Sequence, residues 1–326
     1  MSTRRTRVLA RAILPLVAAV AFASLTVPAA HAADVVTVRD SAGLARALKA
    51  ARAGQTISLA AGRYSGEFVA AASGTASAPV TLTGPRTAVL TTGSTGSGYA
   101  LHITGDRWRV VGFSVRTAEK GIVLDGSVGT VLNSLDVGSI GHEGVHFRAN
   151  SSDGILANSL VHDTGLTKPQ FGEGVYIGSA QSNWSGVTGS ATTPDRSDRV
   201  TVRNNVISNT PAEGVDAKEG TTAGTISSNR FVRTGFSGAN SADSAIDLKG
   251  NAYSVSGNLV SGTKLDAIQV HTVLAGWGNR ARIAGNGVGN GVPGYEVRVQ
   301  ATSVGTVVAC EPSAAGAGLT NARCVP

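Results

Sequence analysis

Six short segments of the chain repeat one pattern: HEGVHFR at residues 142–148, GEGVYIG at 172–178, AEGVDAK at 212–218, DSAIDLK at 243–249, LDAIQVH at 265–271 and VPGYEVR at 292–298. The fourth and sixth places are mostly apolar, whereas the fifth and seventh are mostly polar or charged. A period of two is typical of a strand with one buried face and one exposed face. Because the pattern recurs, we expect these strands to stack into one continuous sheet with a polar outer face.

A second repeat, Asn-x-apolar, begins at Asn133, Asn158, Asn205, Asn229, Asn258 and Asn286, at intervals of 25, 47, 24, 29 and 28 residues. A period in this range, with short strands and Gly or Asn turns, is typical of a solenoid. The long interval indicates one coil that carries an insertion at about residues 179–198. Helical solenoids need long amphipathic helices, which are missing, and the repeat of a β-propeller is longer. The sequence therefore predicts an all-β fold, a right-handed parallel β-helix, as the single domain of residues 33–326.

The start of this domain predicts a cap for the solenoid. A short strand at residues 35–38 is followed by Asp40 and Ser41, either of which can cap a helix. Leu44 and Leu48 would give that helix an apolar face. A short helix in this place would cover the hydrophobic end and the exposed edge of the sheet.

Residues 1–32 have the features of a secretory signal peptide. Four arginines precede an apolar stretch at residues 12–27, and AHA at residues 30–32 is a small-x-small cleavage site. A membrane anchor is the alternative, but the apolar stretch is short and Pro15 interrupts it. The segment holds four arginines and no acidic residue, so its removal lowers the formal charge from +7 to +3. We predict a secreted, extracellular protein that has no membrane attachment after cleavage.

The two cysteines, Cys310 and Cys324, both lie near the C-terminus. Export to an oxidising compartment favours a disulfide that closes the C-terminal tail, with free thiols as the alternative. The mild positive charge permits an acidic polysaccharide as the partner. Lys and Arg are scattered rather than clustered, which argues against nucleic acid. We expect the protein to be a monomer.

The six aligned segments place polar residues in columns, because neighbouring coils of a parallel sheet are about 4.8 Å apart. The second place holds Glu143, Glu173, Glu213, Ser244 and Asp266. The fifth holds His146, Tyr176, Asp216, Asp247, Gln269 and Glu296, and the seventh holds Arg148, Gly178, Lys218, Lys249, His271 and Arg298. Stacked like charges destabilise a sheet unless an opposite charge or a cation intervenes. The columns therefore predict either a surface salt-bridge lattice or a site that holds a cation.

The insertion at residues 179–198 is long for a loop of a compact solenoid, and loops of this kind are often functional. It contains Trp184, which can either stack on a sugar ring or pack the loop against the sheet. Arg148 and Arg298 lie at the margins of the columns. We assign these three residues to substrate binding, with a purely structural role as the alternative.

Several stretches resemble the alginate lyase and chondroitinase B family of β-helix polysaccharide lyases: AGQTI at residues 53–57, AGRY at 61–64, GTASAPV at 74–80, AEGVDAKE at 212–219, NRF at 229–231 and IDLKGN at 246–251. In that family a Glu on one coil helps to bind calcium, and a Lys later in the same strand removes a proton. An Arg on the next coil assists the sugar carboxylate. The resemblance implies that Glu213 binds calcium, that Lys218 is the Brønsted base, and that Lys249 stands in the place of the Arg. Pro211 occupies the place of the family's second acidic ligand.

The reaction that the resemblance implies is β-elimination on a uronate. The uronate carboxylate must be neutralised so that the proton beside it becomes acidic, and a calcium ion with oxygen ligands can do this. The predicted ligands form one contiguous acidic patch: Glu173, Glu213, Asp216 and Asp247. Lys218, with a pKa lowered by Lys249, is predicted to take the proton. His271 or Tyr176 would protonate the leaving oxygen.

Two other functions stay open at this point. A glycoside hydrolase needs two carboxyl groups, and Asp216 and Asp247 would lie about 5 Å apart, which suits a retaining mechanism. A non-catalytic solenoid would use the same columns only as a groove for binding carbohydrate. Dependence on a metal separates these functions, because a lyase of this type fails in chelator and a hydrolase need not.

Overall fold

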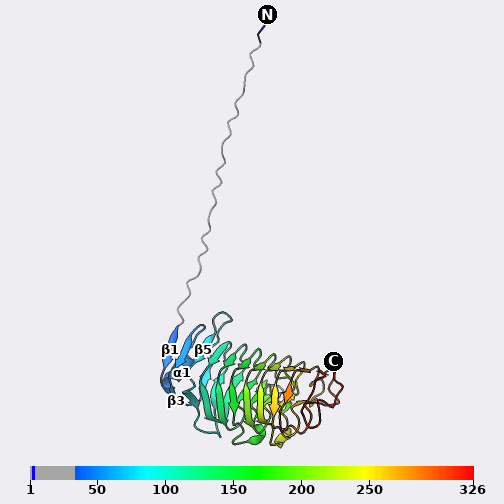
Figure 1. Ribbon diagram of the computed structural model, residues 1–326. Helices are drawn as coiled ribbons and strands as arrows, with labels where there is room; N and C mark the ends of the chain where they lie inside the picture. Colours follow the sequence, from blue (N-terminus) through cyan, green and yellow to red (C-terminus); the bar gives the residue numbers. More distant parts are fainter. Residues whose placement is uncertain (1, 4–33) are drawn as a thin grey trace. The chain divides into compact units, whose positions relative to one another are not determined.

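The computed structural model describes residues 2–3 and 34–326 (Figure 1). The signal peptide predicted at residues 1–32 falls, apart from residues 2–3, outside the described residues. Among the described residues, none of the helices is both long and apolar enough to cross a membrane.

Residues 34–326 wind into a stack of coils, and each full coil contributes one strand to each of three parallel sheets. Sheet A has 11 strands: β1 (Val35–Val38), β2 (Thr56–Leu59), β5 (Val80–Thr83), β8 (Trp108–Val111), β11 (Val131–Asn133), β14 (Ile155–Ala157), β17 (Thr201–Arg203), β20 (Thr225–Ser227), β23 (Ser254–Ser256), β26 (Arg282–Ala284) and β29 (Val307–Val308). Sheet B has nine: β3 (Gly62–Ser65), β6 (Ala88–Thr91), β9 (Ser114–Ala118), β12 (Asp136–Ile140), β15 (Leu160–His162), β18 (Val206–Thr210), β21 (Arg230–Thr234), β24 (Leu259–Ser261) and β27 (Gly287–Val288).

Sheet C carries the repeated segments and also has nine strands: β4 (Phe68–Ala70), β7 (Tyr99–Ile103), β10 (Lys120–Asp125), β13 (Val145–Arg148), β16 (Val175–Ile177), β19 (Val215–Ala217), β22 (Ile246–Leu248), β25 (Ile268–Val270) and β28 (Val297–Val299). Figure 1 shows the coils stacked in chain order. The parallel β-helix that the sequence predicts is confirmed.

Aliphatic side chains from the three sheets fill the inside of the coils. In sheet A, Leu156, Val202, Ile226 and Val255 occupy matching places on consecutive strands, and all are fully buried. Burying a side chain of this size contributes about 1.5–3 kcal/mol. The period-two alternation of the sequence therefore has its expected cause, since one face of each strand packs inside the coil.

An asparagine ladder marks one corner of the coils. The side-chain Nδ2 of Asn205 donates to Oδ1 of Asn229 at 3.0 Å, Asn229 donates to Asn258 at 3.0 Å, and Asn258 donates to Asn286 at 2.9 Å. All four are buried. The same Oδ1 atoms of Asn229, Asn258 and Asn286 also accept the backbone N–H of the asparagine on the preceding coil. The ladder therefore links consecutive coils through groups that would otherwise be unsatisfied.

The ladder does not include the two earlier asparagines of the predicted repeat. Ser159, not Asn158, lies beside Asn205, because Ala157 pairs with Arg203 in sheet A. Asn158 is exposed and donates to Asn133 at 2.8 Å. The repeat identified the coils correctly, but Asn158 is one residue and Asn133 two residues out of register with the ladder.

The two ends of the stack are covered as predicted. The α1 helix (Ser41–Lys49) begins after Asp40, whose side chain accepts from the backbone N–H of Gly43 at 2.6 Å. Leu44 and Leu48 of this helix are buried against the first coil. At the other end, Cys310 and Cys324 form a disulfide, as expected.

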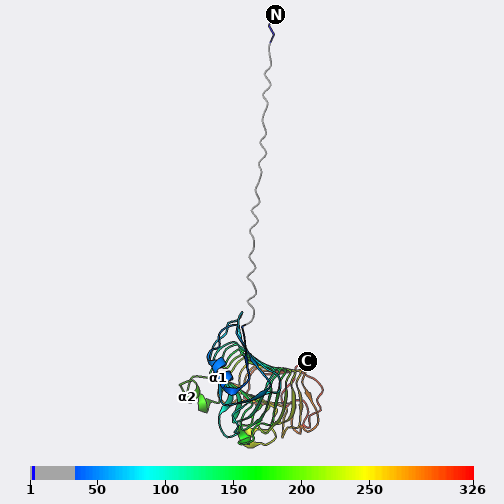
Figure 2. The ribbon, with the colours of Figure 1, turned by 90° about the vertical axis from the view of Figure 1, so that its left-hand side faces the viewer.

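The coil between β14 and β17 carries the predicted insertion. It contains η2 (Gln181–Asn183) and α2 (Trp184–Val187), and Figure 2 shows α2 projecting beyond the stacked coils. Two further loops on the same side contain η1 (Pro169–Phe171) and η3 (Ala239–Ser241), which contact each other. These loops stand beside the outer face of sheet C and shape the site described below.

The last of the six repeated segments has a different register from the one predicted. Ile268 pairs with Val297 and Gln269 pairs with Arg298, a shift of two residues. Glu296 therefore does not belong to the fifth column, and it is buried at the C-terminal end of the sheet. Arg298 takes its place in that column, where it is exposed.

Candidate active site

The outer face of sheet C forms the base of the site. The column of outward-facing residues reads His102, Val123, His146, Tyr176, Asp216, Asp247, Gln269 and Arg298. The polar members from His146 to Gln269 are largely buried although they point away from the core, and most of them pair with neighbouring charged side chains. The predicted fifth-place column is confirmed for the first five repeated segments, from His146 to Gln269.

Three buried carboxyl groups meet in the middle of this face. Glu173, Glu213 and Asp216 each offer an oxygen atom, and these atoms lie within 4.8 Å of one another. Glu173 and Glu213 come from the turns that lead into β16 and β19, and Asp216 lies on β19. Within the described residues, this acidic triad (Glu173, Glu213 and Asp216) is the one group of His, Cys, Asp or Glu side chains with the geometry of a metal site.

The fourth predicted metal ligand, Asp247, is not part of the acidic triad. Its Oδ2 accepts from Nζ of Lys249 at 2.6 Å and its Oδ1 pairs with Nδ1 of His271 at 2.8 Å. Burial raises the pKa of Asp247, but the charge of Lys249 and the contact with His271 outweigh it and hold that pKa well below its usual range. The negative charge of Asp247 is therefore already balanced by Lys249 and His271.

Asp216 connects the acidic triad to two lysines. Nζ of Lys218 lies 2.7 Å from its Oδ2, and Nζ of Lys249 lies 2.7 Å from its Oδ1. Burial lowers the pKa of Lys218, but the negative charge of Asp216 outweighs it and raises that pKa above its usual value. The expectation that Lys249 lowers the pKa of Lys218 is wrong, because a carboxylate lies between the two ammonium groups.

The two glutamates of the acidic triad lack such partners. Burial and the neighbouring charges of Asp216 and Glu143 raise the pKa of Glu173 to about 8. Burial and Asp216 also raise the pKa of Glu213 well above its usual range. Carboxyl groups crowded in this way hold protons in the absence of a cation, and a bound cation would replace those protons. Three carboxylate oxygens form a donor set that suits a hard divalent ion such as calcium.

Tyr176 lies beside the lysine that the sequence predicts as the base. Nζ of Lys218 is 5.1 Å from the centroid of the Tyr176 ring, and the centroid of the His146 ring, which is nearly perpendicular to it, lies 4.5 Å away. Burial and the charge of Asp216 raise the pKa of Tyr176 well above its usual value. The phenol therefore keeps its proton at any physiological pH and can donate it.

A cleft of about 880 Å³ opens over this face. Of the predicted site residues, Glu173, Tyr176, Lys218, Lys249 and Arg148 line it. His271, the alternative to Tyr176 as proton donor, does not line it and is held by Asp247. The geometry therefore favours Tyr176 for that role.

Two residues assigned to substrate binding have other positions. Trp184 is 2% exposed, and its indole N–H donates to the carbonyl of Ser179 at 2.9 Å. The ring packs the insertion down and offers no face for a sugar. Arg298 lies three strands away from Asp216 in sheet C and does not line the cleft.

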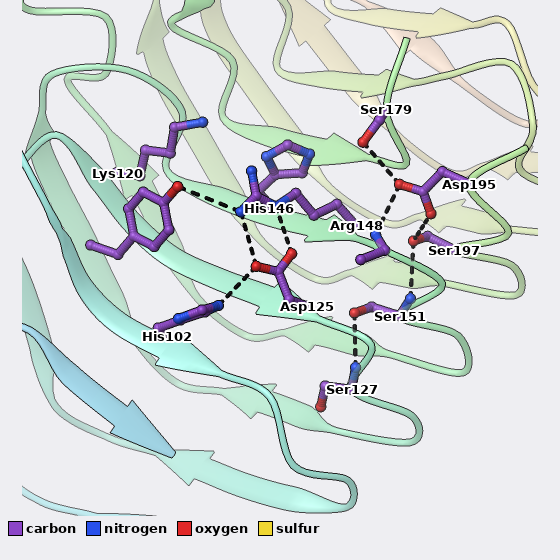
Figure 3. Close-up of polar contacts among 12 residues, drawn as sticks. His102, Lys120, Asp125, Ser127, His146, Arg148, Ser151, Ser179, Asp195 and Ser197 are labelled. Atoms are coloured by element: carbon purple, nitrogen blue, oxygen red, sulfur yellow. Dashed lines mark hydrogen bonds and ion pairs between the residues drawn. The ribbon is translucent and has the colours of Figure 1, made fainter. Parts of the chain in front are cut away.

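The insertion is fixed at its far end by Asp195, a residue that the sequence did not single out. This carboxylate is fully buried and accepts the backbone N–H groups of Ala149 and Asn150 at 2.9 and 2.8 Å. It also accepts the hydroxyl groups of Ser179 and Ser197 at 2.9 and 2.8 Å (Figure 3). The insertion is therefore a fixed wall of the cleft.

The sequence also missed a second polar cluster on the N-terminal side of the cleft. Tyr99 and Lys120 line the cleft beside Arg148, on strands that precede the six repeated segments. Their signal in the sequence was weak, since β7 and β10 lack the EGV motif and β10 carries the apolar Val123 where later strands carry a polar residue.

The hydrolase pair predicted as an alternative is not available for catalysis. Asp216 and Asp247 are 2% and 1% exposed, and Lys249 bridges them with contacts of 2.7 and 2.6 Å. Neither carboxylate lines the cleft. Two carboxylates that share one buried ammonium cannot act as the separate acid and nucleophile of a retaining hydrolase.

The fold and the site together define an enzyme of the β-helix class that acts on carbohydrate, with its chemistry in a cleft on one parallel sheet. An alginate lyase from Paenibacillus sp. str. FPU-7 has 36% sequence identity and a TM-score of 0.82, and the match covers 89% of this chain and 99% of that chain. The chain therefore belongs to the β-helix polysaccharide lyases, as its sequence resemblance implied, and it is a polysaccharide lyase.

Two more distant structures share the fold alone. Pectate lyase Pel9A has 13% identity and a TM-score of 0.57, over 83% of this chain and 78% of that chain. The ORF18 protein of Geobacillus virus E2 has 15% identity and a TM-score of 0.52, over 86% of this chain and 55% of that chain. No family model matches the chain, and neither does the sequence of any curated protein.

Proposed function

We propose that this polysaccharide lyase cleaves a uronate-containing polysaccharide by calcium-assisted β-elimination. The observation that carries the proposal is the placement of Lys218 and Tyr176 side by side in the cleft, directly beside the acidic triad. A base, a proton donor and a cation site are the three parts that this elimination needs.

Glu173, Glu213 and Asp216 would hold the calcium ion. Their three oxygens lie within 4.8 Å of one another. Burial and the charge of Asp216 raise the pKa of both glutamates, which supports a cation as the partner that would let them ionise. A bound calcium ion would neutralise the carboxylate of the sugar and so make the neighbouring carbon acid stronger. Asp247 is left out of this ligand set because Lys249 and His271 already compensate its charge.

Lys218 is the proposed base, and Tyr176 is the proposed acid. Lys218 takes the proton from the carbon beside the sugar carboxylate, and the electron pair of that bond forms a carbon–carbon double bond. The bond to the glycosidic oxygen breaks, and the Tyr176 hydroxyl supplies a proton to that oxygen. Lys218 holds its own proton in the present arrangement, because Asp216 raises its pKa although Lys249 also pairs with that carboxylate. A calcium ion bound by Asp216 would offset the remaining negative charge and lower the pKa of Lys218, so that it could act as the base.

Lys249 supplies positive charge next to the reacting centre. Burial lowers its pKa, but Asp216 and Asp247 outweigh this and raise it, so the side chain stays an ammonium group. It lines the cleft and is therefore placed to attract the carboxylate of the sugar. His271 keeps Asp247 in position rather than reaching the substrate.

We also propose that the enzyme is secreted. The support is the signal-peptide pattern of residues 1–32 and the disulfide between Cys310 and Cys324, which persists in oxidising compartments.

The test is the ultraviolet absorbance of unsaturated uronate during incubation with a panel of acidic polysaccharides. Alginate comes first, because the Paenibacillus relative is an alginate lyase. Wild type, Lys218→Ala and Tyr176→Phe are assayed with calcium and with chelator. Lys49→Ala is the matched control, since Lys49 is an exposed lysine on α1, outside the cleft.

We expect calcium-dependent absorbance from wild type and Lys49→Ala. Both cleft variants should lose at least about a hundredfold in kcat, as is usual when a general acid or base is removed. Full activity in chelator would contradict the calcium assignment. Unchanged kcat in Lys218→Ala would contradict the assignment of the base.

A further inference from the structure

We propose that Lys120, Arg148 and Tyr99 form a subsite that binds the carboxylate of a second uronate, on the N-terminal side of the reacting centre. This inference rests on the proposed function, since it assigns a place to another sugar of the same acidic chain. The three residues line the same cleft as Lys218 and Tyr176, but they lie on earlier coils of sheet C.

Arg148 is held rigidly but keeps part of its guanidinium group free. Its Nε and Nη2 donate to the two carboxylate oxygens of Asp125, the second at 2.9 Å, and His102 also contacts that carboxylate at 2.8 Å (Figure 3). Nη2 also reaches the hydroxyl group of Tyr99 at 3.5 Å. Among the described residues, no oxygen accepts from Nη1. A fixed guanidinium with an unused edge in a cleft is suited to a carboxylate.

Lys120 and Tyr99 complete the subsite. Nζ of Lys120 lies 5.8 Å from the centroid of the Tyr99 ring, and Cζ of Arg148 lies 5.7 Å from it. The ring of His102 meets Tyr99 edge-on at 5.5 Å and so limits its movement. Nζ of Lys120 donates to Glu143 at 2.7 Å and has two more hydrogens for a ligand. An aromatic ring next to two cations can bind a sugar face and its carboxylate together.

The cations of the cleft are separated by whole coils, which suits a polymer that carries a charge on each sugar. One coil of the solenoid advances by about 4.8 Å, which is close to the length of one pyranose ring. Lys120 is on β10, Arg148 on β13, Lys218 follows β19 and Lys249 follows β22. Arg148, Lys218 and Lys249 share one column, whereas Lys120 lies in the column of Glu143, and the coil of β16 adds no cation to the cleft. Lys120 therefore lies three coils from Lys218, about 15 Å along the cleft.

A salt-bridge lattice on the outer surface is the competing explanation, and the chain offers an example of one for comparison. Arg116 on sheet B is bound to Asp136 by an ion pair of 2.6 Å, and its Nη1 donates to two backbone carbonyls at 2.9 and 2.6 Å. Both terminal nitrogens of that guanidinium are thus used within the protein, and Arg116 does not line the cleft. Arg148 differs in both respects.

The test compares substrates of different length. Wild type, Lys120→Met, Tyr99→Leu and the control Arg116→Lys are assayed for uronate absorbance on a trimer and on a decamer of the same acidic polysaccharide. A trimer whose middle sugar lies at Lys218 extends only one sugar, about 5 Å, toward Lys120, which is about 15 Å away, whereas a decamer spans the whole cleft. We expect the two subsite variants to raise KM for the decamer about tenfold, the loss of one charge-assisted contact. Their kcat, and both constants for the trimer, should stay within about twofold of wild type.

Each outcome decides between the possibilities. Equal losses on trimer and decamer would show that these residues only support the fold, and unchanged KM for the decamer would show that no sugar binds there. Either result would overturn the subsite while leaving the lyase reaction intact. Absence of any absorbance with wild type would instead overturn the proposed function on which the subsite rests.

Discussion

The buried carboxyl group of Glu173 links calcium binding to pH. Burial and the charges of Asp216 and Glu143 raise its pKa to about 8, so the cation-free enzyme holds a proton there at neutral pH. The same oxygen is a proposed calcium ligand, and a ligand must lose its proton to bind the ion. Proton and cation therefore compete, and calcium affinity should rise with pH until Glu173 is ionised.

The size of the effect follows from the pKa. With a pKa of about 8, roughly nine in ten molecules are protonated at pH 7, which weakens binding about tenfold relative to the ionised protein. At pH 6 the weakening is about a hundredfold. Glu213, whose pKa is also raised, adds a second proton to this competition. Binding should therefore release at least one proton per calcium ion at neutral pH.

Calorimetric titration with calcium at pH 6, 7 and 8 measures both quantities. Runs in two buffers with different ionisation enthalpies give the number of protons released. Glu173→Gln should bind more weakly and lose the part of the pH dependence that one proton contributes. The matched control is Glu143→Gln, because Glu143 is in the same EGV motif but is paired with Lys120 and His146.

The control should still release a proton when it binds calcium, with the pH dependence moved to lower pH, because the charge of Glu143 contributes to the raised pKa of Glu173. Burial raises the pKa of Glu143, but the contacts with His146 and Lys120 outweigh it and lower that pKa below the range studied. Calcium affinity that does not change between pH 6 and 8 would refute the reasoning, and so would binding without proton release.

Three further predictions concern stability. Asn258→Ala should lower the free energy of unfolding by about 3 kcal/mol in urea titrations, because it leaves several buried partners unsatisfied. Asn133→Ala, from the part-buried start of the same repeat, should cost less than about 1 kcal/mol. Cys310→Ser should destabilise the C-terminal tail by about 3 kcal/mol, as expected for the 14-residue separation from Cys324, and an equal effect of reducing agent on wild type checks this. Asp195→Asn should make the insertion open about tenfold or more often, measured by hydrogen exchange, because an amide cannot accept all four donors.

The sequence predicted the fold because two periodic signals agree. Alternation of apolar and polar residues identified the strands of sheet C, and the Asn repeat measured the length of each coil. Register was predictable only where the motif was strong. Ser159 replaces Asn in the ladder and accepts from the backbone of Leu135 at 3.0 Å, so the real ladder position was hidden by a neighbouring Asn. The predicted register of the final segment was wrong by two residues. The polar and apolar pattern could not reveal this error, because a shift of two residues leaves each side chain on the same face of the sheet.

The sequence predicted which residues of the site lie side by side, but not which of them form ion pairs with one another. Column adjacency placed Asp216, Lys218, Asp247 and Lys249 together, and the structure confirms that placement. Whether a lysine gains or loses affinity for its proton depends on which charged atom is nearest. At 2.7 Å from both lysines, Asp216 outweighs the repulsion between them, and this distance is not encoded in the column pattern.

The EGV motif shows how one local sequence acquires different electrostatic roles along a solenoid. Its three glutamates enter sheet C in the same way, one per coil, so their backbones are equivalent. Glu143 pairs with Lys120 from the preceding coil and with His146 from its own coil. These two contacts lower its pKa, so its carboxyl group stays ionised. Glu173 and Glu213 have Tyr176 and Asp216 in place of that histidine, and burial then raises the pKa of each carboxyl group. A repeated fold thus supplies the geometry, and single substitutions in the neighbouring column decide which copy can bind a cation.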